Sequence, residues 1–529
     1  MAPLLDVNNL SVSFRSRRGD VQAVKGLDFS VDAGSITALI GESGSGKSVA
    51  CYSLLGLVPT PPGSIDSGSA HFDGRDLLRM QEQELRRIRG RDIALVFQDP
   101  MTCLNPFMTI GQQLTEPLRY HQGVDRATAR SRGLQLMDEV GIRDPELGYA
   151  AFPHQFSGGM RQRVMIAMAL INEPRLLIAD EPTTALDVTI QAQILELLAQ
   201  LQKKRDIGIV FISHDLAVVS DIADQIVVMC EGEAVESADR TSIFHSPAHP
   251  YTQKLLAAIP SGAKAPAPER TTQPLLTVSN LSVEFNRDGG QRLKAVDDVS
   301  LALQRGATLG LVGESGSGKS TIARAILRLV PTVAGRIEFD GTELTGLDRR
   351  AMKAMRRRMQ IIFQDPFASL NPRMTVFDTL AEPFLLHGLA TKNDVEAKVH
   401  TLMDDVGLAR TFTRKYPHEF SGGQRQRIAI GRALATKPEL IVADEPVSAL
   451  DVTIQAQILR LLEDLAREYQ LTTLFISHDL AVVRQLADDV VVLRGGMVIE
   501  SGPAGKVLAA PQETYTQELL AAVPGDAWA

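Results

Sequence analysis

The stretch GESGSGKS occupies residues 41–48, and the same eight letters return at 313–320. Each copy follows a short apolar run, ITALI or TLGLV. The pattern GxxxxGK(S/T) after a predicted strand is typical of a phosphate-binding loop, because glycines let backbone N–H groups close around phosphates while the lysine neutralises them. The residues expected to bind nucleotide are Gly41, Ser43, Gly44, Gly46, Lys47 and Ser48 in the first copy, and Gly313, Ser315, Gly316, Gly318, Lys319, Ser320 and Thr321 in the second.

The two loops belong to a much longer repeat that spans the chain. DEPTTALDVTIQAQIL at 180–195 and DEPVSALDVTIQAQIL at 444–459 differ at two positions, and ISHDLAVV occurs at 212–219 and 476–483. A repeat of this length indicates duplicated domains rather than small stacked units. We predict a first domain at 1–260, a linker rich in Pro and Ala at 261–274, and a second domain at 275–529.

Composition places the chain among ordinary globular proteins. Its 529 residues are 44% hydrophobic and 22% charged, and the net charge is −8. This acidic balance argues against a general nucleic-acid binder, since phosphate backbones recruit an excess of Lys and Arg. Three scattered cysteines are too few for a disulfide framework or a zinc ribbon. No apolar run approaches the ~18 residues of a membrane-spanning helix, so the chain is expected to be cytosolic.

The predicted fold is α/β with buried parallel sheets. Short, fully apolar runs such as RLLIAD, ELIVAD, GIVFIS and TTLFIS alternate with helical stretches in each half. Open sheets of this kind bind ligands at the carboxyl ends of their strands. Functional side chains are therefore expected directly after these runs.

Two of the apolar runs end in paired carboxylates, Asp180-Glu181 and Asp444-Glu445. An aspartate in this place suits the coordination shell of Mg²⁺, together with the loop hydroxyls of Ser48 and Ser320. The following glutamate can polarise a water for attack on the γ-phosphate. A strand that ends in Asp-Glu is weak evidence by itself, because a helix cap has the same sequence pattern. The spacing between this pair and the loop lysine strengthens the hypothesis of a catalytic site.

FSGGMRQR at 156–163 and FSGGQRQR at 420–427 resemble the signature of ABC transporter ATPases, ordinarily written LSGGQ. The resemblance covers nearly all of the chain. It implies two tandem P-loop ATPase domains, each with a RecA-like α/β core, an antiparallel β subdomain and an α-helical signature subdomain. It also implies that each ATP is held by the loop of one half and the signature of the other, which explains why one chain carries two copies.

The resemblance assigns further roles. Gln98 and Gln364 match the loop that senses Mg²⁺ and the attacking water and that faces the membrane partner, while His214 and His478 match the switch histidine at the γ-phosphate. Phe14 and Phe285 stand where an aromatic ring stacks on adenine. The signature residues implied in nucleotide binding are Ser157, Gly158 and Gly159 in the first half, and Ser421, Gly422, Gly423 and Gln424 in the second. Met160 stands where the family has glutamine. The site that it would cover, at Lys319, is expected to stay active but to differ in activity from the other site.

QDPMTCLNP, QDPFASLNP and the tail HPYTQKLLAAIP resemble the paired ATPases of oligopeptide and dipeptide importers, here fused as in the Yej type. This implies ATP and Mg²⁺ as cofactors, two integral membrane permease subunits and an external solute-binding protein as partners, and a peripheral place on the cytoplasmic face of the inner membrane. Many relatives carry a cysteine-rich segment beyond the tail; here it is missing, so no iron-sulfur cluster is expected. Peptides, peptide-like antibiotics, glutathione and nickel all remain possible cargoes.

Other classes of protein also use tandem ATPases of this kind. Ribosome-acting forms tend to carry a long, charged linker, whereas this linker is about fourteen mixed residues. DNA-repair forms carry zinc modules, which three scattered cysteines cannot build. A regulatory ATPase without transport is the third alternative, and the importer-like tails oppose it.

Overall fold

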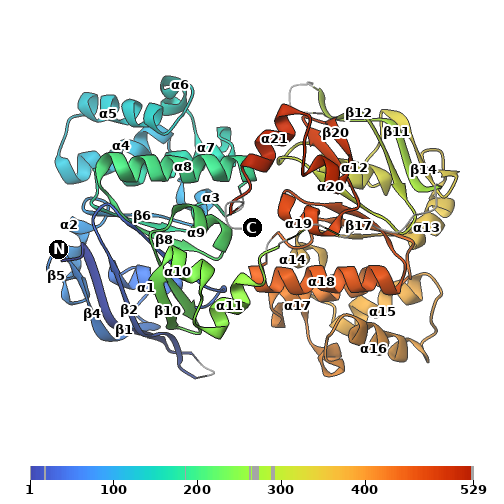
Figure 1. Ribbon diagram of the computed structural model, residues 1–529, viewed down its shortest axis with the longest axis horizontal. Helices are drawn as coiled ribbons and strands as arrows, with labels where there is room; N and C mark the ends of the chain where they lie inside the picture. The colour runs from blue at the N-terminus through green and yellow to red at the C-terminus, as the bar shows by residue number, and fades with distance from the viewer. Residues whose placement is uncertain are drawn as a thin grey trace. The chain divides into compact units, whose positions relative to one another are not determined.

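The computed structural model describes residues 2–16, 19–184, 186–260, 262, 264, 273–286, 292–448 and 450–525 (Figure 1). It divides the chain into two compact units, one built mainly from Met1–Leu186 and Ile190–Ile259, the other mainly from Pro260–Val523. Most of the predicted linker at 261–274 lies outside the described residues, and the first strand of the second unit begins at Pro274.

The first unit contains a six-stranded, mostly parallel sheet. Its order is β10-β9-β3-β8-β7-β6, with antiparallel pairing only between β10 and β9. The carboxyl ends of β3, β8, β7 and β6 therefore lie along one edge, and each is followed by a predicted site residue. The strands are β3 Ile36–Ile40, β6 Ile93–Val96, β7 Leu176–Asp180, β8 Gly208–Ser213, β9 Gln225–Cys230 and β10 Glu233–Asp239.

An antiparallel sheet and a set of helices complete the first unit. The sheet has the order β2-β1-β4-β5, with β1 Leu5–Phe14, β2 Val21–Val31, β4 Gly63–Phe72 and β5 Arg75–Asp76. The α-helices are α1 Lys47–Leu54, α2 Glu82–Ile88, α3 Pro100–Cys103, α4 Ile110–Gln122, α5 Arg126–Glu139, α6 Pro145–Ala150, α7 Gly158–Leu170, α8 Val188–Arg205, α9 Leu216–Ile222, α10 Arg240–His245 and α11 Pro250–Leu256. Two 3₁₀ turns are η1 Leu77–Arg79 and η2 Pro153–Gln155.

The second unit repeats this architecture. Its parallel sheet has the order β16-β17-β18-β13-β19-β20 and its antiparallel sheet β12-β11-β14-β15. The strands are β11 Pro274–Asn286, β12 Arg292–Gln304, β13 Thr308–Val312, β14 Ala334–Phe339, β15 Thr342–Glu343, β16 Met359–Ile362, β17 Leu440–Asp444, β18 Thr472–Ile476, β19 Asp489–Arg494 and β20 Met497–Pro503. The helices are α12 Lys319–Ile326, α13 Arg349–Arg358, α14 Pro366–Ser369, α15 Val376–Leu386, α16 Val395–Asp405, η3 Arg410–Arg414, η4 Pro417–Glu419, α17 Gly422–Leu434, α18 Val452–Glu468, α19 Leu480–Leu486, α20 Ala504–Val507 and α21 Thr514–Ala521.

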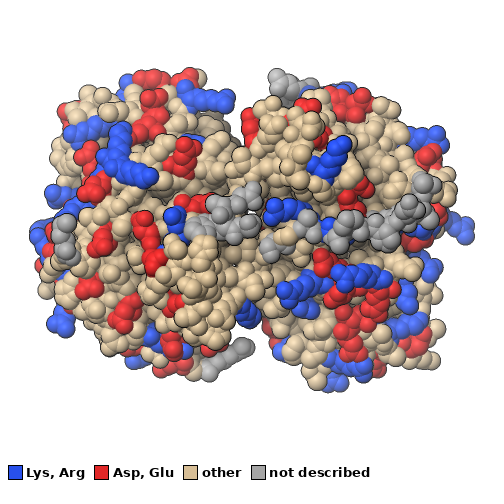
Figure 2. Space-filling model, viewed as in Figure 1, with Lys and Arg blue, Asp and Glu red and all other residues tan. Residues whose placement is uncertain are grey.

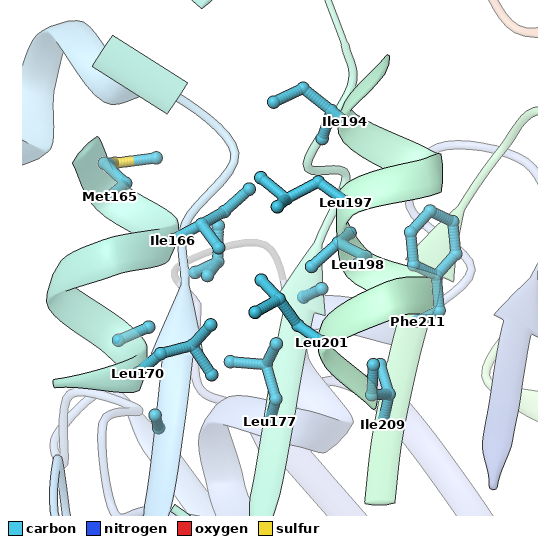
Figure 3. Packing of buried hydrophobic residues seen from close by; sticks show 14 of the residues in the cluster. Met165, Ile166, Leu170, Leu177, Ile194, Leu197, Leu198, Leu201, Ile209 and Phe211 are labelled. Carbon is cyan, nitrogen blue, oxygen red and sulfur yellow. The ribbon is translucent and has the colours of Figure 1, made fainter. Parts of the chain in front are cut away.

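The predicted fold class is confirmed, and the core explains why the strand runs are apolar throughout. Helices α7 and α8 cover the parallel sheet of the first unit, and their apolar faces meet over β7 and β8 (Figure 3). The buried residues of α8 recur at the spacing of one helix face. This packing fixes the start of α7, where the signature lies, to the sheet that carries the phosphate loop. The residues in view are Met165, Ile166 and Leu170 of α7, Ile194, Leu197, Leu198 and Leu201 of α8, and Leu177, Ile209 and Phe211 of the strands.

The surface charge is mixed, and the helices are not of the kind that spans a membrane in the part of the chain that the structure describes. On the face shown in Figure 2, Lys and Arg side chains are interspersed with Asp and Glu over each half. Mixed charge of this kind is ordinary for a solvated surface. Within the described residues, every helix is too short or too polar to cross a bilayer.

Candidate active sites

The phosphate loops lie at the carboxyl ends of β3 and β13 and lead directly into α1 and α12. Gly41 has a φ of 150°, and a Cβ added there would lie 2.2 Å from the Met229 carbonyl oxygen. A Cβ on Gly46 would lie 2.3 Å from the Ala23 oxygen. Both positions therefore require glycine. Gly313 and Gly318 stand in the corresponding places, with φ values of 145° and 101°.

The crest of each loop is open to solvent. Ser43 and Gly44 are exposed at the first crest, and Ser315 and Gly316 at the second. A Cβ on Gly44 or Gly316 would meet nothing within 4 Å. The loops thus present backbone to free space at the place where the sequence predicts phosphate binding.

Each loop encloses its own lysine. The Lys47 ammonium donates hydrogen bonds to the carbonyl oxygens of Gly41 at 2.8 Å and Glu42 at 2.9 Å. Lys319 makes the same bonds to Gly313 and Glu314, at 2.6 and 2.9 Å. Burial lowers the pKa of Lys319, although nearby carboxylates act in the opposite direction. The ammonium group of each lysine is thus held at its loop, where a positive charge can attract phosphate oxygens.

The loop serine and the strand aspartate of each half are hydrogen-bonded. The Ser48 hydroxyl donates to Asp180 Oδ1 at 2.9 Å, and Ser320 donates to Asp444 Oδ1 at 2.8 Å. Burial raises the pKa of both aspartates. In the first half Tyr52 also donates to Asp180 Oδ2, at 2.7 Å. Tyr52 was not predicted as a site residue, although it lies one helical turn beyond Ser48 on the same face of α1.

In the first half the glutamate after the strand is surrounded by the predicted residues. The Gln98 amide donates to Glu181 Oε2 at 2.7 Å, and His214 Nδ1 lies 3.0 Å from Glu181 Oε1. The Thr184 hydroxyl, which sequence analysis missed, donates to Glu181 Oε2 at 3.0 Å. Burial alone would raise the pKa of Glu181, but His214, Thr184 and Lys47 outweigh it and hold that pKa below its ordinary value.

The second half brings the same three side chains together. Gln364 donates to Glu445 Oε2 at 2.9 Å, and His478 Nδ1 lies 3.1 Å from the same oxygen. Burial would raise the pKa of Glu445, yet His478 and Lys319 lower it overall. Burial would likewise lower the pKa of His478, and the Glu445 carboxylate raises it. The pair is therefore biased toward an ionised glutamate beside a protonated histidine.

Both glutamates occupy strained backbone. Glu181 has a φ of 45° and Glu445 a φ of 46°, in the left-handed region that side chains other than glycine rarely adopt. Each is held there by its N–H, which donates to the carbonyl oxygen of Ile212 or Ile476 in the neighbouring strand at 3.0 Å. The same backbone conformation therefore recurs directly after β7 and β17.

The signature serines begin helices α7 and α17. Ser157 accepts a hydrogen bond from the Met160 N–H at 3.4 Å, and Ser421 accepts one from the Gln424 N–H at 3.4 Å. In the second half the Gln424 side chain returns a bond by accepting from the Ser421 N–H at 3.2 Å. Met160 has no side-chain oxygen, so the reciprocal bond is specific to the second half.

Signature glycines allow close packing of these helices. A Cβ on Gly159 would lie 2.5 Å from Ile190 Cγ2, and one on Gly423 would lie 2.4 Å from Ile454 Cγ2. Gly158 and Gly422, one position earlier, have more room. The second glycine of each signature is therefore required by helix packing.

Each half thus brings together its loop lysine and serine, the strand aspartate and glutamate, the glutamine and the histidine. The remaining predicted nucleotide contacts lie on other elements: Phe14 ends β1, and Phe285 lies near the end of β11. Phe14 is half-buried against the core of its sheet, whereas Phe285 is 38% exposed. Their stacking on adenine, and the role of Thr321 at the start of α12, stay predictions.

Comparison with known proteins identifies the family of the chain. The family described as "ABC transporter" matches residues 24–184 and 296–448, and the family "Oligopeptide/dipeptide transporter, C-terminal region" matches 235–279. The chain is 48% identical to a peptidoglycan transport ATP-binding protein YejF of Agrobacterium fabrum, covering 98% of this chain and 96% of that protein.

Two Escherichia coli K12 proteins are similarly related. An ABC transporter ATP-binding protein YejF is 49% identical over 98% of this chain and 99% of its own length. A glutathione import ATP-binding protein GsiA is 46% identical over 98% of this chain and 89% of its own length. The chain therefore belongs to the ABC transporter family, as a tandem pair of ATP-binding ATPase domains.

Proposed function

We propose that this chain hydrolyses ATP to power the import of peptides or peptide-like solutes across the inner membrane. The observation that carries this proposal is the importer-type tail, matched at 235–279, on a chain with two intact catalytic clusters. The similar proteins named for peptidoglycan transport and glutathione import support the same class of cargo. Pairing of each phosphate loop with the signature of the other half remains a prediction.

The donor sets of both halves fit Mg²⁺. This ion prefers oxygen ligands and is usually held by one or two carboxylates together with substrate phosphates. Ser48 with Asp180, and Ser320 with Asp444, supply one hydroxyl and one carboxylate each within hydrogen-bond distance of one another. We assign these four residues to the ion, with Gln98 and Gln364 beside them. When bound, it neutralises negative charge on the phosphates.

Hydrolysis is assigned to the glutamate clusters. Glu181 and Glu445, kept ionised by their lowered pKa values, accept a proton from the water that attacks the γ-phosphate. His214 and His478 orient these carboxylates, and Gln98 and Gln364 donate to them from the next strand. The loop lysines neutralise the phosphates from within their glycine loops.

Exposed apolar side chains near the glutamines support docking of membrane partners. Met101 is 64% exposed and Phe107 is 90% exposed, both in the segment between Gln98 and α4. Phe367, after Gln364, is 63% exposed, with Arg425 packed over one face of its ring. Large apolar side chains left in solvent often mark protein contacts. We infer that two integral membrane permeases dock there, with an external solute-binding protein completing the transporter and the chain peripheral on the cytoplasmic face.

Purification of the chain from solubilised membranes of its own cells tests this proposal, with mass spectrometry of what accompanies it. We expect two polytopic membrane proteins, and a solute-binding protein whose bound ligand names the cargo. Variants with Phe107→Ser and Phe367→Ser should lose the membrane proteins while keeping ATP binding. Recovery of ribosomal or DNA-repair proteins instead would contradict the import function and favour the alternative of a soluble tandem ATPase.

A further inference from the structure

The tail of each half, with helix α11 in the first and α21 in the second, reaches back to the phosphate loop. Tyr251, the second residue of α11, accepts a hydrogen bond on its phenol oxygen from the Glu42 N–H at 3.3 Å. In the second half Tyr515 of α21 accepts the equivalent bond from the Glu314 N–H at 3.4 Å. Glu42 and Glu314 are the second residues of their loops. The same long-range contact therefore forms twice, over 209 and 201 residues of chain.

The peptide unit held by the tyrosine is also one of those that hold the lysine. Its N–H belongs to Glu42 and its carbonyl to Gly41, and that carbonyl accepts from Lys47 Nζ at 2.8 Å. Gly41 has a φ of 150°, so the glycine itself does little to restrict rotation of this peptide. Fixing the N–H on the tyrosine therefore fixes the direction of one of the two carbonyl groups that hold the lysine.

The tails are anchored well enough to impose this constraint. Glu236 of β10 accepts from the N–H groups of Ala248 and His249, at 2.7 and 3.1 Å, just before α11. Glu500 of β20 accepts from Gln512 and Glu513 in the same manner, at 2.9 and 3.3 Å. Because both tails are tied to a sheet strand, each tyrosine ring has a fixed position.

The apolar side of each tail is buried as well. Leu255 of α11 and Leu519 of α21 lie in the cores of their units. Tyr515 is itself buried, and burial raises its pKa to about 12, so its hydroxyl stays neutral at any physiological pH. A neutral phenol oxygen can accept from a backbone N–H, as the geometry requires.

We propose that Tyr251 and Tyr515 are positioning residues for ATP binding, which hold the first peptide of each phosphate loop so that its lysine faces the nucleotide. This rests on the ATP hydrolysis proposed above, but not on the identity of the cargo or of the membrane partners. It gives the tail of this family a role inside the ATPase domain itself.

Single variants Tyr251→Phe and Tyr515→Phe, and the double variant, test the proposal, because phenylalanine keeps the ring and removes only the hydroxyl. Loss of one hydrogen bond to a neutral group typically changes an equilibrium by about 3- to 10-fold. We expect the double variant to raise the KM for ATP, and the Kd measured by calorimetry with ATP and Mg²⁺, by about that factor while kcat changes less.

Tyr469→Phe is the matched control. Its hydroxyl donates to Asp405 Oδ2 at 2.8 Å just after the end of α18, so the variant loses a tyrosine hydrogen bond that lies away from the loop. It should lower the Tm of the chain as the tail variants do, without changing the affinity for ATP. Unchanged KM and Kd in the double variant, or an equal rise in Tyr469→Phe, would overturn the proposal. If no membrane proteins accompany the purified chain, the import function is contradicted, but the test of the two tyrosines by KM and Kd is unaffected.

Discussion

The two halves carry the same six types of side chain at their proposed sites but surround them differently. In the first half Asp180 accepts from two hydroxyl groups, those of Ser48 and Tyr52. In the second half Asp444 accepts from Ser320, and the place of Tyr52 is taken by Arg324, whose charge helps to lower the pKa of Asp444. The proposed catalytic residues are thus duplicated, while the groups around the carboxylate proposed to bind Mg²⁺ differ between the halves.

A second difference lies at the signature helices. Ser421 and Gln424 exchange two hydrogen bonds at the start of α17, whereas Ser157 and Met160 form one at the start of α7. The phosphate loops differ once more, where Val49 replaces the hydroxyl of Thr321. These changes sit beside the catalytic groups rather than in them, so we expect two active sites of unequal affinity.

Removal of the catalytic glutamates should have the largest effect. Glu181→Gln and Glu445→Gln keep the shape of the side chain but cannot accept the proton, and loss of a general base typically costs about 10²- to 10⁴-fold. We expect each single variant to lose at least half of the steady-state phosphate release and the double variant to lose about 100-fold or more. Glu196→Gln, an exposed position on α8, is the control. Full turnover in either single variant would show that its site is dispensable.

Tyr52→Phe should weaken the first site specifically. Loss of a group that orients a metal-binding carboxylate commonly costs about 10-fold in metal affinity. The Tyr52 hydrogen bond also lowers the pKa of Asp180, so its loss should raise that pKa further. We expect ATP binding to the first site to require about 10-fold more Mg²⁺, measured by titration of Mg²⁺ at fixed ATP.

Arg324→Ala gives the comparison at the second site. It removes a charge but no hydrogen bond to Asp444, so the shift in Mg²⁺ requirement should be smaller than that of Tyr52→Phe. Tyr120→Phe, an exposed tyrosine on α4, should have no effect. Equal shifts in all three variants would remove the proposed difference between the sites.

Exchange of the signature residues should alter helix stability in opposite directions. Met160→Gln restores the carbonyl that closes a capping box on α7, and Gln424→Met removes it from α17. Capping interactions contribute about 1 kcal/mol, which shifts the Tm of a domain this size by about 2–4 °C. Calorimetry of the two variants should show a rise for the first and a fall for the second. Shifts of the same sign would refute this account of the asymmetry.

The smallest expected effect is on the pH dependence of stability. Glu445 has a lowered pKa, so its contribution is fully present above its ordinary value of 4.5 and is lost as pH falls through the folded-state pKa. His478 has a raised pKa, so its contribution is fully present below 6.5 and is lost as pH rises through the folded-state value.

The pair should therefore stabilise the chain most between about pH 4.5 and 6.5. Denaturation of the wild type and of His478→Gln across this range should give a difference of about 0.5 kcal/mol, which shrinks as the pH rises above 6.5. His400→Gln, on α16, is the control. A difference that grows toward pH 9 would contradict the assignment of the charges.

Much of the fold could be predicted because the decisive signals are local. The apolar runs at 36–40, 176–180 and 208–213 form adjacent parallel strands, and their carboxyl ends place Lys47, Glu181 and His214 on one edge. The loop motif likewise predicted a glycine at position 41, and the φ of 150° there explains why glycine is needed. These features depend on a few consecutive residues and on the general rules of parallel sheets.

What could not be predicted depends on contacts between distant segments. The bond from Tyr251 to the loop joins residues 209 apart, and no periodicity indicates it, although the repeated YTQ of both tails marks the segment. Tyr52 could have been found, since it shares a helix face with Ser48, whereas its bond to Asp180 spans 128 residues. Local sequence patterns predict the helices and strands. The contacts within the site depend on side chains from distant segments that meet at the edge of the sheet.

The most direct test of the account is solute uptake by the reconstituted complex. The chain and the membrane proteins that accompany it are placed in proteoliposomes with the solute-binding protein and its bound ligand, and accumulation is followed with and without ATP. We predict uptake that needs ATP and fails in the Glu181→Gln/Glu445→Gln double variant. Equal uptake by that variant, or hydrolysis of ATP without any uptake, would contradict the claim that these two sites power import.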